Sequence, residues 1–251
     1  FKFNDFNALE KICSNNRIGV IKMEIFRNIP PAKNFLKKVR NLATKKGIVL
    51  IFDECTSGFR ESFGGLHIKY KIFPDICILG KALGNGFPIT AILGKKEIME
   101  NAQSSFISST FWTERSGPSA AIKTLELMQK IKSWKKIKQT GIKIKKNWNQ
   151  ILRSNKLKFE INGIDPLPSF LIKHQEWLKI KTIITQEMLE KKILATNTVY
   201  TCIDHDKKVL ENYFENLNDI IHKIGLQIDK NNPIDELLKG PVSKSGFYRL
   251  N

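Results

Sequence analysis

Cysteine is scarce in this sequence, and its placement excludes two kinds of site. The 251 residues include only four cysteines, Cys13, Cys55, Cys77 and Cys202. No two of them form a Cys-x-x-Cys pair, so neither a zinc ligand set nor a disulfide framework is expected. The four histidines are equally scattered and show no metal-ligand spacing. A reducing cytosol is the simplest setting for such a protein, and we expect a cytoplasmic location.

Long hydrophobic runs are also lacking. No apolar stretch approaches the ~20 residues that a membrane-spanning helix needs. Hydrophobic residues make up 41% of the chain and charged residues 26%, as in an ordinary globular protein. The chain begins Phe1-Lys2-Phe3, with neither a methionine nor a signal-peptide pattern. We therefore expect a globular protein that is a piece of a longer chain.

Acidic residues are in short supply beside 42 Lys and Arg, which gives a net charge of +18. The segment 130–158 has no Asp or Glu. This excess allows a noncatalytic basic module that binds nucleic acid or an acidic partner. Within the segment, however, Trp134, Ile137, Ile144 and Trp148 recur at helical spacing and predict one apolar helix face. Because the tryptophans lie on that face rather than among the lysines, a solvated basic helix is the favoured interpretation.

Strand and helix patterns alternate in the first part of the chain. A helix capped by Asn4 or Asp5 and a strand at 18–26 come first, and Pro30-Pro31 then opens a helix that Gly47 closes. The apolar run 48–52 predicts a buried strand that ends in Asp53-Glu54. This βαβ unit implies a parallel sheet. Later elements are expected at 76–79 and 89–93 (strands), 96–103 (helix) and from Pro118 (a helix with Ile122, Leu125 and Met128 inward).

Beyond the basic helix the organisation changes. Short strands at 157–161, 169–173 and 197–201 alternate with helices near 182–193 and 206–224. The last helix carries an apolar stripe of Val209, Tyr213, Leu217, Ile220 and Ile224. We place a domain boundary near 154. The sequence thus predicts an α/β fold with a mostly parallel sheet in 1–154, followed by a smaller α+β domain in 155–251.

One lysine stands among glycines just after a predicted strand. Lys81 follows the apolar run 76–79 and is flanked by Gly80, Gly84 and Gly86. A lysine at a strand end lies at the sheet edge where α/β folds bind ligands, and a desolvated lysine becomes a nucleophile for imine formation. A phosphate-binding P-loop is excluded, because it would need glycine where Asp75 stands and Ser or Thr at Ala82.

Asp53 ends one predicted strand and Lys81 follows another. An acid and an imine-forming lysine at neighbouring strand ends suit pyridoxal phosphate. The carboxylate would keep the pyridine nitrogen protonated, and the lysine would hold the aldehyde. Taken alone, Asp53 is also typical of a helix cap or turn, and Lys81 of a surface lysine.

Several motifs together resemble the class III aminotransferases of fold type I, particularly the branch that includes glutamate-1-semialdehyde aminomutase. The resemblance is dense from about 47 to 126. It implies the partial large domain of a pyridoxal-phosphate-dependent transferase, a cytoplasmic homodimer, and a chain that ends naturally in Gly246-Phe-Tyr-Arg-Leu-Asn251. The matching pieces are Ile48-Val-Leu-Ile-Phe-Asp-Glu54, Gly58-Phe-Arg60, Gly64-Gly65, Pro74-Asp75, Gly80-Lys81-Ala-Leu-Gly-Asn-Gly-Phe-Pro88 and Ser109-Thr110.

Site residues follow from the resemblance position by position. It implies that Asp53 contacts the pyridine nitrogen, that Lys81 carries the cofactor, and that Thr110 reaches the cofactor phosphate of the neighbouring subunit. Cys55 and Thr56 stand where many members have valine and glutamine. Cys55 can still pack on the ring face, whereas a hydrogen bond from Thr56 to the ring hydroxyl is less secure.

Two further features bear on the substrate and on cofactor binding. Ile29 replaces the glutamate switch of the ornithine and 4-aminobutyrate types, which argues against those substrates. The family's N-terminal portion, with its phosphate-cradling loop and ring-stacking aromatic, has no counterpart here. We therefore expect this chain to bind the cofactor weakly or not at all, and to be inactive alone.

The leading hypothesis is a pyridoxal-phosphate-dependent transaminase or aminomutase that uses a small amino donor and a carbonyl acceptor, with Lys81 as proton shuttle. Arg115 is a candidate for holding a substrate carboxylate or lining a subunit interface, and equally a surface arginine. The alternative is the basic module at 130–158. The sequence does not separate transamination from amino-group migration.

Overall fold

The computed structural model describes residues 1–26, 28–108, 110–111 and 113–244. The chain forms two compact units, Phe1–Lys136 (the first unit) and Ile137–Asn251 (the second unit). This division lies inside a helix, whereas the sequence places the boundary at that helix's end, near 154; the assignment of domains 1–154 and 155–251 stays a prediction. In the described part of the chain, no helix is both long and apolar enough to span a membrane.

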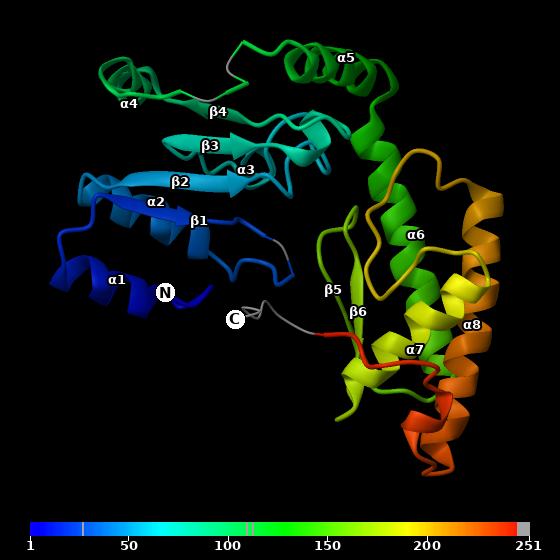
Figure 1. The fold of residues 1–251 in the computed structure, drawn as a ribbon. Helices are drawn as coiled ribbons and strands as arrows, with labels where there is room; N and C mark the ends of the chain where they lie inside the picture. The colour runs from blue at the N-terminus through cyan, green and yellow to red at the C-terminus, as the bar shows by residue number, and fades with distance from the viewer. Residues whose placement is uncertain (27, 109, 112, 245–251) are drawn as a thin grey trace. The chain divides into compact units, whose positions relative to one another are not determined.

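The first unit is built on a four-stranded sheet in the order β1-β2-β3-β4 (Figure 1). β2 pairs in parallel with both β1 and β3, while β4 runs antiparallel to β3. The mostly parallel sheet predicted from the βαβ pattern is confirmed. The strands are β1 (Val20–Met23), β2 (Val49–Glu54), β3 (Ile76–Leu79) and β4 (Ala91–Gly94).

One helix precedes β1 in the sequence, and another lies between β1 and β2. α1 (Phe6–Asn15) begins at Asp5, whose carboxylate accepts a hydrogen bond from the backbone N–H of Ala8, as the capping prediction requires. α2 (Phe35–Lys45) follows β1 along the chain, and its Val39 is fully buried. Along β2 burial alternates, so Leu50 and Phe52 lie in the core while Asp53 stays partly exposed.

α2 begins later than Pro30-Pro31 predicts. The side chain of Asn4 donates to the carbonyl of Pro30 and accepts from the N–H of Ala32, at 3.0 and 2.8 Å. These two bonds hold the proline segment outside the helix, because its backbone groups already have a partner far away in the sequence. The predicted helix start is therefore wrong, and the helix begins only at Phe35.

The remaining elements of the first unit are all helical segments. In α5, Ala121 is buried and Leu125 and Met128 pack on the same cluster, whereas Ile122 is 61% exposed. The expectation that Ile122 points inward is wrong because it lies about 100° around the helix from Ala121. These elements are α3 (His67–Tyr70), η1 (Lys81–Leu83), α4 (Lys96–Met99), η2 (Glu100–Ser104) and α5 (Ser116–Ile131).

The basic helix is α6 (Ser133–Ser154). Its predicted apolar face is confirmed, since Ile144 and Trp148 are fully buried. Lys135 and Lys143, in contrast, are exposed. With the indole of Trp148 in the core, base stacking on that side chain has no structural basis, and the nucleic-acid alternative gains no support.

The second unit packs helices against a two-stranded antiparallel sheet. Its core includes Trp148, whose indole donates to the hydroxyl of Tyr213 at 2.9 Å. Gly141 of α6 meets the 165–166 backbone so closely that a Cβ would lie 1.6 Å from the carbonyl oxygen of Asp165. The elements are β5 (Phe159–Asn162), β6 (Ser169–Ile172), α7 (Trp177–Glu190), α8 (Lys207–Asp229) and η3 (Ile234–Leu237).

Two predictions for the second unit need correction. The segment 197–201 is extended and bonds to the backbone at 166–170, but only a single bridge, between Ser169 and Thr198, joins it to β6. In α8 the predicted stripe is buried except at its first member, Val209, which is 48% exposed. Val209 lies in the first turn of α8, where it lines a cavity.

Candidate functional site

Asp53 lies near the carboxyl end of β2. Its carboxylate contacts the ammonium of Lys22 on β1 at 3.1 Å and accepts the backbone N–H of Cys55 at 3.2 Å. Partial burial would raise the pKa of Asp53, but the hydrogen bonds from Lys22 and Cys55, with the charges of Lys22 and Lys81, hold it below its usual value. The carboxylate is therefore ionised at neutral pH.

Lys81 stands just beyond the carboxyl end of β3, after Gly80. Its backbone is left-handed, with φ of +45°, a conformation that costs a non-glycine residue energy. Its Nζ donates to Oγ1 of Thr56 at 2.8 Å. Thr56 is 9% exposed, so a largely buried residue holds the end of the lysine side chain. Lys81 itself is exposed, so the desolvated lysine considered from the sequence is not observed in this chain.

The pairing of β2 with β3 places Asp53 and Lys81 at neighbouring strand ends. Asp53 is the direct partner of Ile78 in the parallel pairing of β2 with β3. Side chains at the carboxyl ends of adjacent parallel strands share one edge of the sheet. An ionised carboxylate and a primary amine thus stand on neighbouring strand ends, as the sequence predicts.

Gly80 makes room for the side chain of Cys55. A Cβ at this position would lie 2.7 Å from Sγ of Cys55 and 3.2 Å from Cγ2 of Thr90. The half-buried sulfur of Cys55 is in turn 3.7 Å from Nζ of Lys81. The glycine is therefore required by close packing at the strand end.

Glu54 is the residue whose role sequence reasoning missed. It is fully buried on the opposite face from Asp53, and it accepts the backbone N–H groups of Leu66 and His67 and the hydroxyl of Ser57. The ring Nδ1 of His67 lies 2.6 Å from its Oε1. The glutamate therefore closes the loop that follows β2. Its place directly after Asp53 was the available signal, because successive strand residues face opposite ways.

Cys77 forms a group with Glu54 and His67, whose potential ligand atoms all lie within 4.8 Å of one another; Glu54 and Cys77 are buried and His67 is partly buried. The scattered positions of these residues in the sequence gave no sign of this. Burial, together with the nearby charges of Glu54 and Asp53, raises the pKa of the Cys77 thiol to about 12. At neutral pH the thiol stays protonated, which is the poorer form for binding a metal.

Asp75 anchors the start of β3. Its buried carboxylate meets Arg40 and Lys95, each at 2.8 Å, and accepts the N–H of Leu50 at 2.8 Å. Burial alone would raise the pKa of Asp75, but these hydrogen bonds and charges lower it. Asp75 therefore holds the start of β3, the strand that Lys81 follows.

The structure leaves two predicted residues outside this cluster. Thr110 lies in an exposed turn, and Arg115 is exposed at the start of α5, where its carbonyl accepts from the N–H of Ser119. Their assigned roles stay predictions. Ser109, part of the motif with Thr110, lies outside the described residues, as does 246–251, for which a natural chain end was expected.

The chain was compared with known protein families and proteins. Residues 28–194 match the family model of the class III aminotransferases. The chain is 30% identical over 220 residues to glutamate-1-semialdehyde 2,1-aminomutase of Methanosphaera stadtmanae, covering 80% of this chain and 52% of the relative. It is 29% identical over 219 residues to 3-aminobutyryl-CoA aminotransferase of Cloacimonas acidaminovorans, covering 82% and 53%. The chain thus spans about half the length of these curated relatives.

Solved structures share the fold at lower identity. The FumI protein of Sphingopyxis sp. MTA144, in its PLP internal aldimine form, superposes with a TM-score of 0.86 at 18% identity, covering 95% of this chain and 60% of that one. Ornithine aminotransferase of Plasmodium yoelii superposes with a TM-score of 0.77 at 20% identity, covering 90% and 62%.

Proposed function

Because this chain belongs to the class III aminotransferases, we propose that Lys81 and Asp53 form the cofactor site of an enzyme that moves an amino group with pyridoxal phosphate. The observation that carries the proposal is the meeting of an amine and an ionised carboxylate at the ends of β3 and β2. The amine would bind the aldehyde, and the carboxylate the ring nitrogen, of one flat heterocycle.

The residues present fit this cofactor. Asp53, with its lowered pKa, offers a negative charge that would hold a proton on the pyridine nitrogen. When bound, the cofactor supplies an electron sink for the carbanion that forms next to the amino group. Sγ of Cys55 lies 3.7 Å from Nζ of Lys81, and this side chain would pack against the ring face.

Lys81 has two tasks in this proposal. Its amine would hold the aldehyde carbon of the cofactor and, when released, would take up and return the proton of the substrate carbon next to nitrogen. Thr56 holds Nζ at 2.8 Å and so orients the amine before the cofactor arrives. This bond to Lys81 is a different task for Thr56 from the one expected, a hydrogen bond to the ring hydroxyl.

The wider assembly belongs to the same proposal. Thr110 would contact the phosphate of a cofactor held by a second copy, which makes the active form a homodimer, and Arg115 would bind a substrate carboxylate or line the interface. The relatives named above include both an aminomutase and an aminotransferase, which supports amino transfer as the reaction class. Four free cysteines support a reducing compartment, and we propose the cytoplasm.

The test is covalent labelling of the lysine. The full-length protein and this chain are each incubated with pyridoxal phosphate, reduced with borohydride, digested and mapped by mass spectrometry. The expected result is a reduced label on Lys81 in the full-length protein. Lys96→Ala serves as the matched control because Lys96 is 87% exposed, and it should leave the label unchanged. A label confined to other lysines would refute the assignment.

A further inference from the structure

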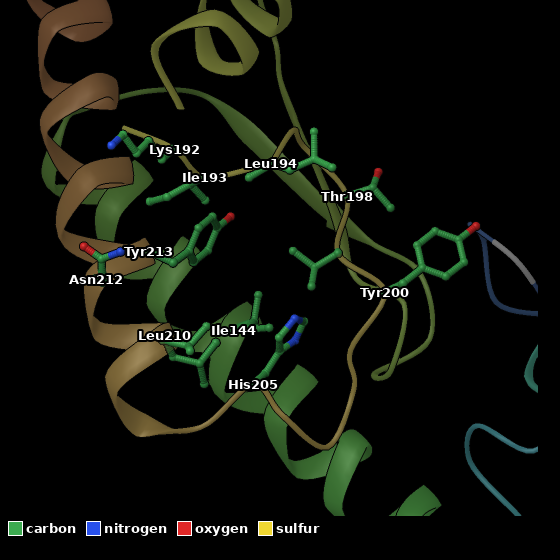
Figure 2. A pocket seen from close by; sticks show the side chains of 13 residues that line it. Ile144, Lys192, Ile193, Leu194, Thr198, Tyr200, His205, Leu210, Asn212 and Tyr213 are labelled. Carbon is green, nitrogen blue, oxygen red and sulfur yellow. The ribbon is translucent and has the colours of Figure 1, made fainter. Parts of the chain in front are cut away.

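The second unit contains a cavity of about 590 Å³ that the proposed cofactor site does not use. It lies between α6, the start of α8 and the segment 192–200, and Figure 2 shows the side chains around it. Ile144 and Leu210 form its apolar floor. We call it the Tyr213 cavity, after the residue whose hydroxyl Figure 2 shows directed into it. Its size and apolar lining are those of a small-molecule site.

The hydroxyl of Tyr213 is the first of two hydrogen-bond donors at the cavity. The residue is 7% exposed, and its oxygen accepts the indole N–H of Trp148 at 2.9 Å. Among the described residues, no acceptor is assigned to the hydroxyl hydrogen of Tyr213. A buried donor without a partner is costly, and a ligand oxygen in the cavity would remove that cost.

His205 supplies a second donor from the neighbouring wall. Its Nδ1 accepts the backbone N–H of Cys202 at 3.5 Å, which leaves the proton of the neutral ring on Nε2. Burial lowers the pKa of His205 and outweighs the opposing charge of Asp204, so the ring is neutral at pH 7. Figure 2 shows the ring beside Ile144 and Leu210, facing the cavity.

The charged side chains around the cavity indicate which kind of ligand oxygen it would bind. Lys192 is one of the lining residues, and none of the described residues that line the cavity is Asp or Glu. Two neutral donors and one cation complement an anion rather than an amine, although the carboxylate of Asp204 lies close enough to His205 to act on its charge. Most of the other lining residues are aliphatic, which favours a ligand with an apolar body.

We propose that the Tyr213 cavity binds a small molecule with an apolar body and one carboxylate, whose oxygens accept hydrogen bonds from Tyr213 and His205. The proposal goes beyond the amino-transfer site and does not depend on it. An aryl-alkanoate is a suitable chemical class, since a planar ring fits against Ile144 and Leu210 while the carboxylate reaches the two donors.

The experiment titrates this chain with 3-phenylpropionate and follows the histidine ring protons by NMR. Binding should be saturable, and the pKa of His205 should rise, because a bound carboxylate stabilises the imidazolium. His67, His174 and His222 serve as internal references whose ring signals should not respond to the ligand. The matched ligands 3-phenylpropan-1-ol and 3-phenylpropylamine should bind at least about tenfold more weakly.

Substitutions at the lining residues test whether the ligand binds in the cavity. Tyr213→Phe should weaken binding about tenfold, but it also removes the acceptor of Trp148, so thermal unfolding is measured alongside. Ala195→Phe fills the cavity without touching that bond and should abolish binding. Lys192→Ala should weaken binding, whereas Lys191→Ala, next to it and outside the lining, should not.

Four outcomes would overturn the proposal: no saturable binding, equal binding of the alcohol, an unchanged pKa of His205, or full binding by a folded Ala195→Phe protein. A concentration-dependent dimer that Ala195→Phe disrupts, without carboxylate binding, would instead assign this surface to a second copy of the chain.

Discussion

The ammonium of Lys22 lies 3.1 Å from the carboxylate of Asp53, across the parallel pair of β1 and β2. The proposed partner of the cofactor nitrogen is thus held by a lysine of the same chain. Because Lys22 is 56% exposed, it can leave when a ligand arrives without uncovering a buried charge. In the free protein Lys22 therefore helps to hold the pKa of Asp53 below its usual value.

Replacing Lys22 with methionine should raise the pKa of Asp53, since both a hydrogen bond and a positive charge are lost. The measurement is an NMR titration of the Asp53 carboxyl carbon. Lys96→Met provides the control, because Lys96 pairs with Glu100 instead. An identical Asp53 titration in the wild-type and Lys22→Met proteins would show that Lys22 does not hold the carboxylate in solution.

Asp75 should make stability depend on pH in the acid range. Its pKa is lowered in the folded protein, so its stabilising effect is full above its unfolded pKa of ~3.9 and is lost as pH falls through the folded value. Asp75→Asn should lower the free energy of unfolding by about 3 kcal/mol at pH 7, because Arg40 loses its buried partner.

Urea unfolding at pH 7 and pH 3 tests the Asp75 prediction. The difference between wild type and Asp75→Asn should shrink at the lower pH. Glu100→Gln breaks an exposed pair and should change stability by less than ~0.5 kcal/mol at either pH. A pH-independent effect of Asp75→Asn would indicate a packing defect rather than lost charge.

Gly80→Ala should destabilise the first unit by about 1–3 kcal/mol, because the new methyl group meets Sγ of Cys55 at 2.7 Å. Cys55→Ala removes that sulfur, so the double variant should recover most of the loss. Gly19→Ala is the matched control, since nothing lies within 4 Å of a Cβ there. Thermal unfolding of the wild type and of these four variants decides whether the contact with Cys55 is the cause.

Thr56→Val should slow the borohydride-trapped labelling of Lys81 by pyridoxal phosphate several-fold, because the amine loses the hydroxyl that orients it. Thr56→Ser keeps the hydroxyl and should label at nearly the wild-type rate. Rates are followed by peptide mass spectrometry in the full-length protein. Equal rates for valine and serine would mean that the Thr56 bond plays no part in presenting the lysine.

Local sequence patterns predicted the elements that deliver the site. The apolar run 48–52 is bounded by Gly47 and followed by two acids, which identifies both a buried strand and its end. The glycines beside Lys81 likewise mark a close approach of the backbone, and Gly80 confirms it. Both patterns can be read from the sequence because the residues that mark a strand and its end are neighbours along the chain.

The missed features depend on contacts between distant parts of the chain. Lys22 meets Asp53, and Glu54 meets His67, only through strand pairing and loop closure that a single-sequence pattern does not encode. Asn4 similarly binds the Pro30 segment from far away in the sequence and delays the start of α2. Tertiary contacts override local start signals in this way.

The closure of the 55–67 loop by Glu54 has a consequence for motion. Opening this loop would expose a carboxylate that is 0% accessible and strip it of the N–H groups of Leu66 and His67. Because Glu54 itself belongs to β2, we expect loop and strand to exchange their amide hydrogens as one cooperative unit. The proposed reactive end of the sheet would then be among the last parts of the first unit to fluctuate, and the cofactor would meet a rigid edge.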